Sequence, residues 1–360
     1  MGNGQWAMGN GFLKRGKRKR VKEEEFFPFP FPLSPSFLTN SLFPITNSLF
    51  PTPHSPFPTP HALVLGDISM DRRLEGKVAI VTGAGAGIGE AIAHKFAKEG
   101  ASVVVNGLPS DPIEDVVQSI KHYGGKAIAY AGDVSQEFHA KNCVQTAINA
   151  YGKLDILINN AGVFLATAQT EDYPIDVFDD TIRMNLRSAF LMTKFSLPHL
   201  QKTRGNIVSA GSEAGFNGLP YNTTYGGTKG WMHSFMQGVA VEQAKHGIRA
   251  NCVCPGAIDT AWTHKETGPM DAKMEKSLIE GTPLARRGTP EEMANVYAFI
   301  ASDEASYVTG ALWLADGGVT VAKGSAGSET PLWMRFAPKG ELRLDHSKEG
   351  LENKDTQTLK

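Results

Sequence analysis

The feature of this 360-residue chain that most restricts its fold is a glycine-rich segment, TGAGAGIG at residues 82–89. It follows an apolar run, VAIV, and opens a stretch with apolar residues at helical spacing, Ile88, Ile92 and Phe96. Glycines let a backbone approach a pyrophosphate closely, and the free N–H groups and dipole at a helix N-terminus favour negative charge. The segment therefore predicts a strand, a turn and a helix that together bind a nucleotide.

A tyrosine and a lysine lie four residues apart at Tyr225 and Lys229, inside a predicted helix at residues 221–245. Residues four apart share one helix face, so the Lys229 ammonium can favour the phenolate of Tyr225. We therefore expect the pKa of Tyr225 to be lowered from about 10, which would suit it to proton transfer near neutrality. The same spacing also occurs in ordinary amphipathic surface pairs, so the pattern needs support from the rest of the chain.

Apolar, β-branched runs alternate with amphipathic stretches through the middle of the chain. The alternation predicts one α/β domain with a doubly wound, Rossmann-type fold, in which helices cover both faces of a seven-stranded parallel sheet. Strands are predicted at residues 78–82, 102–106, 127–131, 156–159, 206–209, 249–254 and 311–315. Helices are predicted at residues 87–99, 112–123, 137–151, 174–200, 221–245 and 290–301. Ligands of such sheets bind beyond the carboxyl ends of the strands, where the glycine segment and the later motifs fall.

Several short motifs follow one another in a fixed order. They are the TGxxxGxG glycines, Asp133-Val134, Asn159-Asn160-Ala161-Gly162, Asn185, Ser212, the YxxxK of Tyr225 and Lys229, and Pro255-Gly256. In this order they resemble the short-chain dehydrogenase/reductase family, over roughly residues 74–324. The stretches at residues 226–231 and 283–292 are similar to members called glucose 1-dehydrogenases or 3-oxoacyl reductases.

The resemblance implies a dinucleotide site and a catalytic set. The implied cofactor-binding residues are Gly83, Gly87, Ile88, Gly89, Asp133, Val134, Asn159, Ala161, Gly162, Tyr225, Lys229, Pro255, Gly256 and Thr260. The implied catalytic residues are Asn185, Ser212, Tyr225 and Lys229. In these roles Asp133 would bond the adenine amino group, Asn159 would lie under the nicotinamide ribose, and Thr260 would meet the carboxamide.

The resemblance also implies the reaction. We expect an NAD(P)-dependent oxidoreductase that interconverts a secondary alcohol, of sugar or polyol type, and the ketone or lactone by hydride transfer, with Tyr225 as acid and base and Ser212 bonded to the substrate oxygen. One alternative is a reductase of 3-oxoacyl thioesters or other ketones. Another is a nucleotide-binding scaffold without turnover.

The choice between NAD and NADP depends on the end of the second strand. A carboxylate there would read the ribose 2′-hydroxyl, but the aligned position is Gly107. A 2′-phosphate would need a cation, and Ala86 and Leu108 stand where one is expected. Asn106 or Ser110 could donate a hydrogen bond to either cofactor. We expect NAD, because binding a 2′-phosphate without a neighbouring cation costs more free energy than binding a 2′-hydroxyl without a hydrogen-bond acceptor.

The composition restricts partners and compartment. A formal net charge of −1 at pH 7 gives no general attraction to nucleic acid or to an anionic membrane, and no apolar run is long enough to span a bilayer. Cys143, Cys252 and Cys254 cannot build a disulfide framework. We expect Cys252 and Cys254 to face opposite sides of a strand, and a metal site would need more ligands than these. The sequence thus predicts a cytoplasmic protein without a metal ion.

The two ends differ from the middle. Residues 1–69, rich in proline, are predicted to be a disordered extension, and their basic cluster at residues 14–22 leaves nuclear or organelle targeting open. The domain is predicted at residues 70–323, and Met70 could be the true start. Residues 324–360 form a predicted tail, which we expect to pack on the domain or on a neighbouring subunit through the apolar residues Leu332, Trp333, Met334 and Phe336; a loose tail is the alternative.

Two further expectations concern association and substrate access. The predicted helices at residues 174–200 and 221–245 carry more apolar positions than one sheet face needs, for example Phe190 and Phe235. Family members usually pair through such helices, so we expect a homo-oligomer, most simply a tetramer. Residues 261–281, which include Trp262 and Met270, are expected to form a mobile lid over a small alcohol or ketone.

Overall fold

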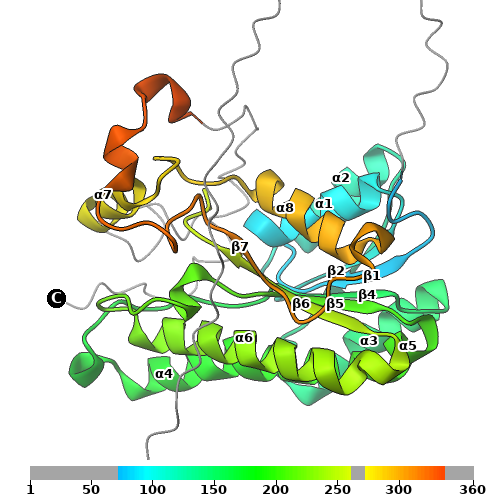
Figure 1. The fold of residues 1–360 in the computed structure, drawn as a ribbon. Coiled ribbons are helices and arrows are strands. Elements are labelled where there is room, and N and C mark those ends of the chain that lie inside the picture. The colour runs from blue at the N-terminus through cyan, green and yellow to red at the C-terminus, as the bar shows by residue number, and fades with distance from the viewer. Residues whose placement is uncertain (1–71, 261–271, 337–360) are drawn as a thin grey trace, which may run out of the picture. The chain divides into compact units, whose positions relative to one another are not determined.

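Seven parallel strands form one sheet in the order β3-β2-β1-β4-β5-β6-β7 (Figure 1). The structure is a computed structural model that describes residues 72–260 and 272–336. The strands are β1 (Val78–Val81), β2 (Ser102–Gly107), β3 (Lys126–Ala131), β4 (Ile156–Asn159), β5 (Asn206–Ala210), β6 (Arg249–Pro255) and β7 (Leu312–Ala315). The predicted seven-stranded, doubly wound sheet is therefore confirmed.

The strand order reverses next to β1. The chain builds outward from β1 through β2 to β3 and then returns to place β4 on the other side of β1, in register from Ala79 opposite Ile156. At such a reversal the connections after β1 and β4 lead to opposite faces of the sheet, which opens a crevice at their carboxyl ends. All four residues of each strand are buried, so these two strands form the centre of the core.

Helices cover both faces of the sheet (Figure 1). On one face, α1 (Gly87–Lys98), α2 (Ile113–His122) and α8 (Pro290–Ala301) pack around Phe96 and Tyr297. On the other face, α3 (Glu137–Tyr151), α5 (Ser188–Thr203) and α6 (Thr223–Gln243) pack around Met192 and Met236. These side chains are all fully buried, so each apolar helix stripe predicted from the sequence covers one side of the sheet.

The helix predicted at residues 174–200 is interrupted. It consists of α4 (Ile175–Ile182), a π-helical turn at Arg183–Arg187, and α5. A π turn inserts one extra residue into a helix, and such insertions are frequent at functional sites. Periodicity did not predict this turn, because the apolar residues on both sides of it remain compatible with one amphipathic helix.

The segment expected as a lid contains a helix, α7 (Ala272–Gly281), which the sequence did not predict. Residues 261–271, with Trp262 and Met270, lie outside the described residues. None of the helices in the described part of the chain is long and apolar enough to cross a lipid bilayer.

The expectation that Cys252 and Cys254 face opposite sides of their strand was wrong. Side chains two residues apart on a strand point to the same face, so Cys252 and Cys254 lie together in the core beneath α6, and not on opposite sides. Both are completely buried.

The described part of the tail, residues 324–336, lies against the end of α7. A side chain at Gly327 would collide with the carbonyl oxygen of Thr282, and the Thr330 hydroxyl donates a hydrogen bond to the carbonyl oxygen of Pro283. The apolar residues that follow remain exposed by 50–76%; they are Leu332, Trp333, Met334 and Phe336. Their packing on a neighbouring subunit stays a prediction.

Candidate active site

The glycine turn after β1 and the turn after β4 are joined. Gly83 and Gly87 have left-handed φ angles of 61° and 57°, which only glycine adopts without strain. A Cβ on Gly83 would lie 2.9 Å from the Cα of Ala161. The side chain of Asn160 donates hydrogen bonds to the carbonyl oxygens of Thr82 and Gly83, at 3.1 and 3.0 Å. The two turns therefore form one floor at the topological reversal, where a pyrophosphate can approach bare backbone.

Other predicted cofactor residues surround this floor. Gly89 lies against the carbonyl of Gly83, and the methyl group of Thr260 lies 3.3 Å from the position of a Cβ on Gly87. Ile88 is partly buried against the core, and Val134 is buried. Pro255 ends β6, and Gly256 lies so close to Asp316 that a Cβ would be 2.9 Å from its Cα. Contact of each residue with a cofactor stays a prediction.

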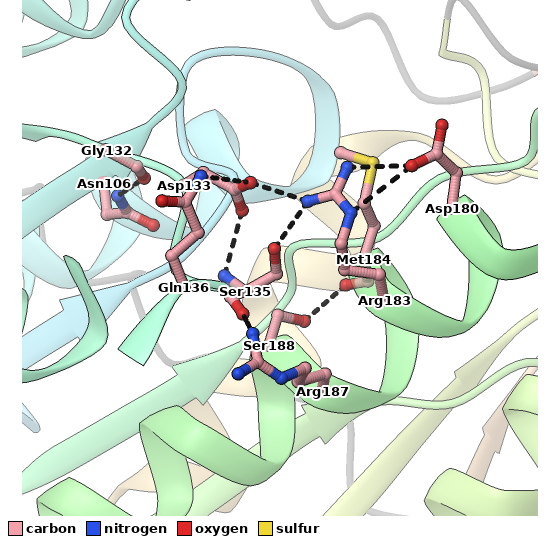
Figure 2. A network of polar contacts seen from close by, with 10 residues as sticks. All are labelled: Asn106, Gly132, Asp133, Ser135, Gln136, Asp180, Arg183, Met184, Arg187 and Ser188. Atoms are coloured by element: carbon pink, nitrogen blue, oxygen red, sulfur yellow. Dashed lines mark hydrogen bonds and ion pairs between the residues drawn. The ribbon is translucent and has the colours of Figure 1, made fainter. Parts of the chain in front are cut away.

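Asp133 is held by an arginine that sequence reasoning missed. Figure 2 shows Arg183 between Asp133 and Asp180, with nitrogen-to-oxygen distances of 2.6 and 3.1 Å. Arg183 also donates to the Ser135 hydroxyl at 2.6 Å, and the backbone N–H of Ser135 donates to Asp133 Oδ1 at 2.9 Å. Burial opposes ionisation of this carboxyl, but the hydrogen bonds from Ser135 and the charge of Arg183 outweigh it, so the pKa of Asp133 is lowered. The carboxylate is thus fixed in its ionised form after β3.

The side chain of Asn159 points away from the floor. It is buried, and its amide donates to the hydroxyls of Thr193 and Ser209, both at 3.1 Å. Its Oδ1 has no hydrogen-bond partner among the described residues. Asn159 therefore ties β4 to α5 and β5, and its role beneath a ribose stays a prediction.

Asn185 lies in the π turn and reaches the other side of the crevice. Its Oδ1 accepts from the backbone N–H of Val163 at 2.6 Å, and its Nδ2 donates to the carbonyl of Val163 at 2.9 Å and to the Thr228 hydroxyl at 3.1 Å. Gly162 separates it from Lys229: a Cβ there would lie 3.2 Å from Asn185 Oδ1 and 3.8 Å from Lys229 Nζ. The amide is thus rigidly held next to the lysine.

Ser212, Tyr225 and Lys229 converge although they come from different elements. Ser212 follows β5, and its hydroxyl oxygen accepts from the backbone N–H of Ala214 at 3.2 Å. It also hydrogen-bonds Tyr225, which favours the phenolate. Lys229 lies one turn further along α6, with Nζ 5.4 Å from the centre of the Tyr225 ring and 2.9 Å from the carbonyl oxygen of Ala210. The structure therefore brings all four predicted catalytic residues to one side of the crevice.

We expected the pKa of Tyr225 to be lowered, but in the protein without a bound cofactor it is raised. Burial is the largest influence on Tyr225 and raises the pKa of its phenol; the Ser212 hydrogen bond opposes this, and the Glu213 carboxylate reinforces it. Burial also lowers the pKa of Lys229 to about 8, so its ammonium is less firmly charged than the sequence suggested. The sequence could not show this, because desolvation depends on everything packed around the pair.

The end of β2 holds a carboxylate that the sequence alignment missed. Asp111 lies between Gly107 and the glycine turn: a Cβ on Gly107 would be 2.7 Å from Asp111 Oδ2, and a Cβ on Gly85 would be 2.8 Å from Asp111 Cβ. Oδ2 accepts from the backbone N–H of Leu108 at 2.7 Å, and burial raises the pKa of this carboxyl. Asn106, which the sequence offered as a possible hydrogen-bond donor to either cofactor, is 1% exposed, and its side chain donates to the backbone carbonyl oxygens of Gly107, Tyr130 and Gly132.

Comparisons with known proteins agree with this geometry. A family model described as enoyl-(acyl carrier protein) reductase matches residues 83–320. The chain is 40% identical to an L-rhamnose 1-dehydrogenase (NAD(P)(+)) of Sphingomonas sp. strain SKA58 over 251 residues, which are 69% of this chain and 98% of that protein. It is 36% identical to glucose 1-dehydrogenase 2 of Bacillus subtilis over 259 residues, 70% of this chain and 98% of that protein.

A solved structure has the same fold. The 3-ketoacyl-(acyl-carrier-protein) reductase of Brucella melitensis, complexed with NADH, aligns with a TM-score of 0.63 and 33% identity, over 69% of this chain and 99% of that chain. The seven-stranded sheet, the glycine turn at its reversal and these similarities lead to one conclusion. The chain belongs to the short-chain dehydrogenase/reductase family and is an NAD(P)-binding oxidoreductase.

Proposed function

We propose that the protein interconverts a secondary alcohol of sugar or polyol type and the corresponding ketone or lactone. The observation that carries this proposal is the convergence of Asn185, Ser212, Tyr225 and Lys229 beside the glycine floor. A bound nicotinamide would supply or accept the hydride. The protein has to hold the substrate oxygen, move one proton and keep the reacting atoms in place.

Each catalytic residue has a defined task. In the direction of reduction, the Tyr225 hydroxyl donates its proton to the carbonyl oxygen, and the Ser212 hydroxyl donates a hydrogen bond to the same oxygen as it gains negative charge. In the direction of oxidation Tyr225 must act as a base, although burial raises its pKa. The positive charge of an oxidised nicotinamide would favour the phenolate, in addition to the Lys229 ammonium. Asn185 positions the turn next to Lys229 through Val163 and Thr228.

A buried carboxyl next to Ser212 favours a polyhydroxylated substrate. Glu213 is 8% exposed, burial raises the pKa of its carboxyl, and the side chain of Asn217 hydrogen-bonds it. A carboxyl and an amide at this place can accept from and donate to sugar hydroxyls. Two relatives named as sugar 1-dehydrogenases agree with this choice. A 3-oxoacyl thioester is the alternative, which the relative complexed with NADH supports.

We further propose that NAD is preferred over NADP, with Asp111 as the supporting observation. Asp111 belongs to the loop after β2, but its carboxylate lies next to Gly107. In nucleotide-binding folds of this type a carboxylate at the end of the second strand accepts a hydrogen bond from the ribose hydroxyl. A carboxylate accepts hydrogen bonds from the ribose and repels a 2′-phosphate. Among the side chains described at this strand end, Ala86 and Leu108 offer no compensating cation.

The decisive test combines a substrate screen with Tyr225→Phe. We expect the parent to oxidise aldoses or polyols faster than it reduces a 3-oxoacyl thioester. Tyr225→Phe should lose at least about a thousandfold in turnover but largely retain NADH binding, because it removes the hydroxyl that transfers the proton and leaves the glycine turn unchanged. Glu213→Gln should raise KM for the sugar more than it lowers kcat. Turnover of Tyr225→Phe within tenfold of the parent would contradict the assignment, and thioester reduction alone would select the alternative substrate.

Association and compartment are also proposals. Exposed apolar side chains on α4, α5 and β7, among them Phe178, Phe190 and Trp313, support a homo-oligomer, with a tetramer as the expected state. Three buried, unpaired cysteines fit a reducing compartment such as the cytoplasm. Sedimentation at micromolar concentration tests the first proposal: a monomer alone would refute it.

A further inference from the structure

A buried histidine and two buried cysteines meet behind the catalytic serine. His233 comes from α6, and Cys252 and Cys254 come from β6. They are 5%, 0% and 0% exposed, and their ligand atoms all lie within 4.8 Å of one another. The sequence showed only the two cysteines, because His233 approaches them through the packing of α6 on the sheet.

Two of the three donor atoms, His233 Nε2 and Cys254 Sγ, are close to the spacing that a zinc ion requires, and Cys252 Sγ lies within 4.8 Å of both. Zinc bonds of about 2.0–2.1 Å to nitrogen and about 2.3 Å to sulfur, at a tetrahedral angle, place the two donors about 3.5 Å apart. His233 Nε2 and Cys254 Sγ are 3.3 Å apart. Nε2 accepts a long hydrogen bond of 3.5 Å from the backbone N–H of Ser212, so a lone pair is available on this nitrogen.

The surrounding loop is shaped around the imidazole. A Cβ on Gly211 would lie 2.7 Å from His233 Nε2 and 2.8 Å from Cys254 Sγ, and a Cβ on Gly215 would lie 2.5 Å from His233 Cε1. The Phe216 ring covers the imidazole at 4.4 Å between centroids. The ring is therefore fixed with its Nε2 edge toward the thiols.

From this arrangement we propose that His233, Cys252 and Cys254 bind one Zn²⁺ per chain, and that the ion inhibits the enzyme. On binding, Zn²⁺ displaces one proton from each thiol and is held by two thiolates and Nε2, with a water as the fourth ligand. The two thiolates neutralise the ion, so the nearby Lys229 ammonium does not exclude it. Zinc and the Ser212 N–H compete for the same lone pair, so binding displaces the loop that carries the Ser212 hydroxyl.

The direct test is metal stoichiometry on the full-length protein without an affinity tag. After treatment with EDTA, the protein is titrated with ZnCl₂ against a chromophoric chelator, and with CoCl₂ to follow the thiolate-to-cobalt charge-transfer band. We expect one ion per chain and a charge-transfer band. Cys254→Ser and His233→Asn should each weaken binding at least about tenfold, and Cys254→Ser, which removes one of the two thiolates, should also weaken the band. Cys143→Ser removes an equally buried thiol on α3, outside the cluster, and should bind as the parent does.

The outcomes separate this site from the catalytic assignment. Bound zinc should abolish turnover of the parent but leave NADH binding unchanged, and EDTA should restore activity. Failure of the parent to bind zinc above background would overturn the proposal, as would equal binding by Cys254→Ser. Zinc that binds at the three ligands but leaves turnover unchanged would refute the inhibition. Neither result would alter the roles proposed for Tyr225 and Ser212.

Discussion

The position of Asp111 makes a quantitative prediction about cofactor choice. Asp111→Asn keeps an oxygen that can accept from the Leu108 N–H but removes the charge next to Gly107. A hydrogen bond to a charged group contributes about 1.5–3 kcal/mol, so the loss of one such bond to the ribose should raise Kd for NADH about 10-fold to 100-fold.

The same change should strengthen NADPH binding. Two unit charges 4 Å apart, at an effective dielectric constant of about 20, repel each other by about 4 kcal/mol, and screening by solvent and salt reduces this value. With the carboxylate gone, we expect the ratio of the two dissociation constants to move toward NADPH on the order of 100-fold.

The assay is a fluorescence titration with NADH and NADPH at one fixed ionic strength. Asp115→Asn is the matched control: it makes the same charge change one turn further along, at an exposed position of α2. A ratio that moves by less than about threefold, or equally in both variants, would show that Asp111 does not read the ribose. If every variant still binds NADH measurably, the position of the dinucleotide site is not in question, and only the role of Asp111 is tested.

Three other predictions use the same geometry. Gly107→Asp should weaken NADH binding, because its Cβ would lie 2.6 Å from Ile113 and 2.7 Å from Asp111; stronger NADH binding in a titration would contradict this. Arg183→Met should release Asp133 and weaken NADH binding, while urea unfolding shows a loss of only about 0.5–1 kcal/mol, since the ion pair is partly exposed; unchanged Kd would contradict the positioning role. The pKa of Lys229 is about 8 in the folded protein and about 10.5 in an unfolded chain. Between pH 8 and pH 10.5 the unfolded chain therefore binds more protons than the folded protein. In this range the free energy of unfolding should rise with pH, by at most about 1.4 kcal/mol per pH unit. Lys229→Met should remove this rise, and parallel pH curves from urea unfolding would refute it.

Local sequence was sufficient for the type and order of most elements. Period-two and period-3.6 patterns depend on which face of a strand or helix is buried, and the seven strands and the main helices follow from them. The interruption of the helix at Arg183–Arg187 was not visible, because one extra residue shifts the apolar stripe without erasing it. The helix α7 was missed because it is only 10 residues long and forms the end of a segment that was expected to be a mobile lid.

In the candidate site, too, the sequence predicted the local motifs but not the contacts between distant residues. The glycine turn and the Tyr225–Lys229 spacing could be recognised because a few neighbouring residues define each of them. Contacts between distant residues could not: Arg183 reaches Asp133 across 50 positions, and His233 reaches Cys254 across 21. Asp111 is only four residues from Gly107, but the path of the loop returns its carboxylate to the strand end.

The charge state of the catalytic tyrosine shows most clearly what only the tertiary structure decided. The sequence determined that a phenol and an amine share one helix face. It could not determine that both are desolvated, because burial depends on residues from other segments, such as Ala210 on β5 next to Lys229 and Phe164 against the Tyr225 ring. Desolvation disfavours the charged form of each group, and this effect exceeds their mutual attraction, so the pKa values move in the opposite direction to the one that pairing alone predicts.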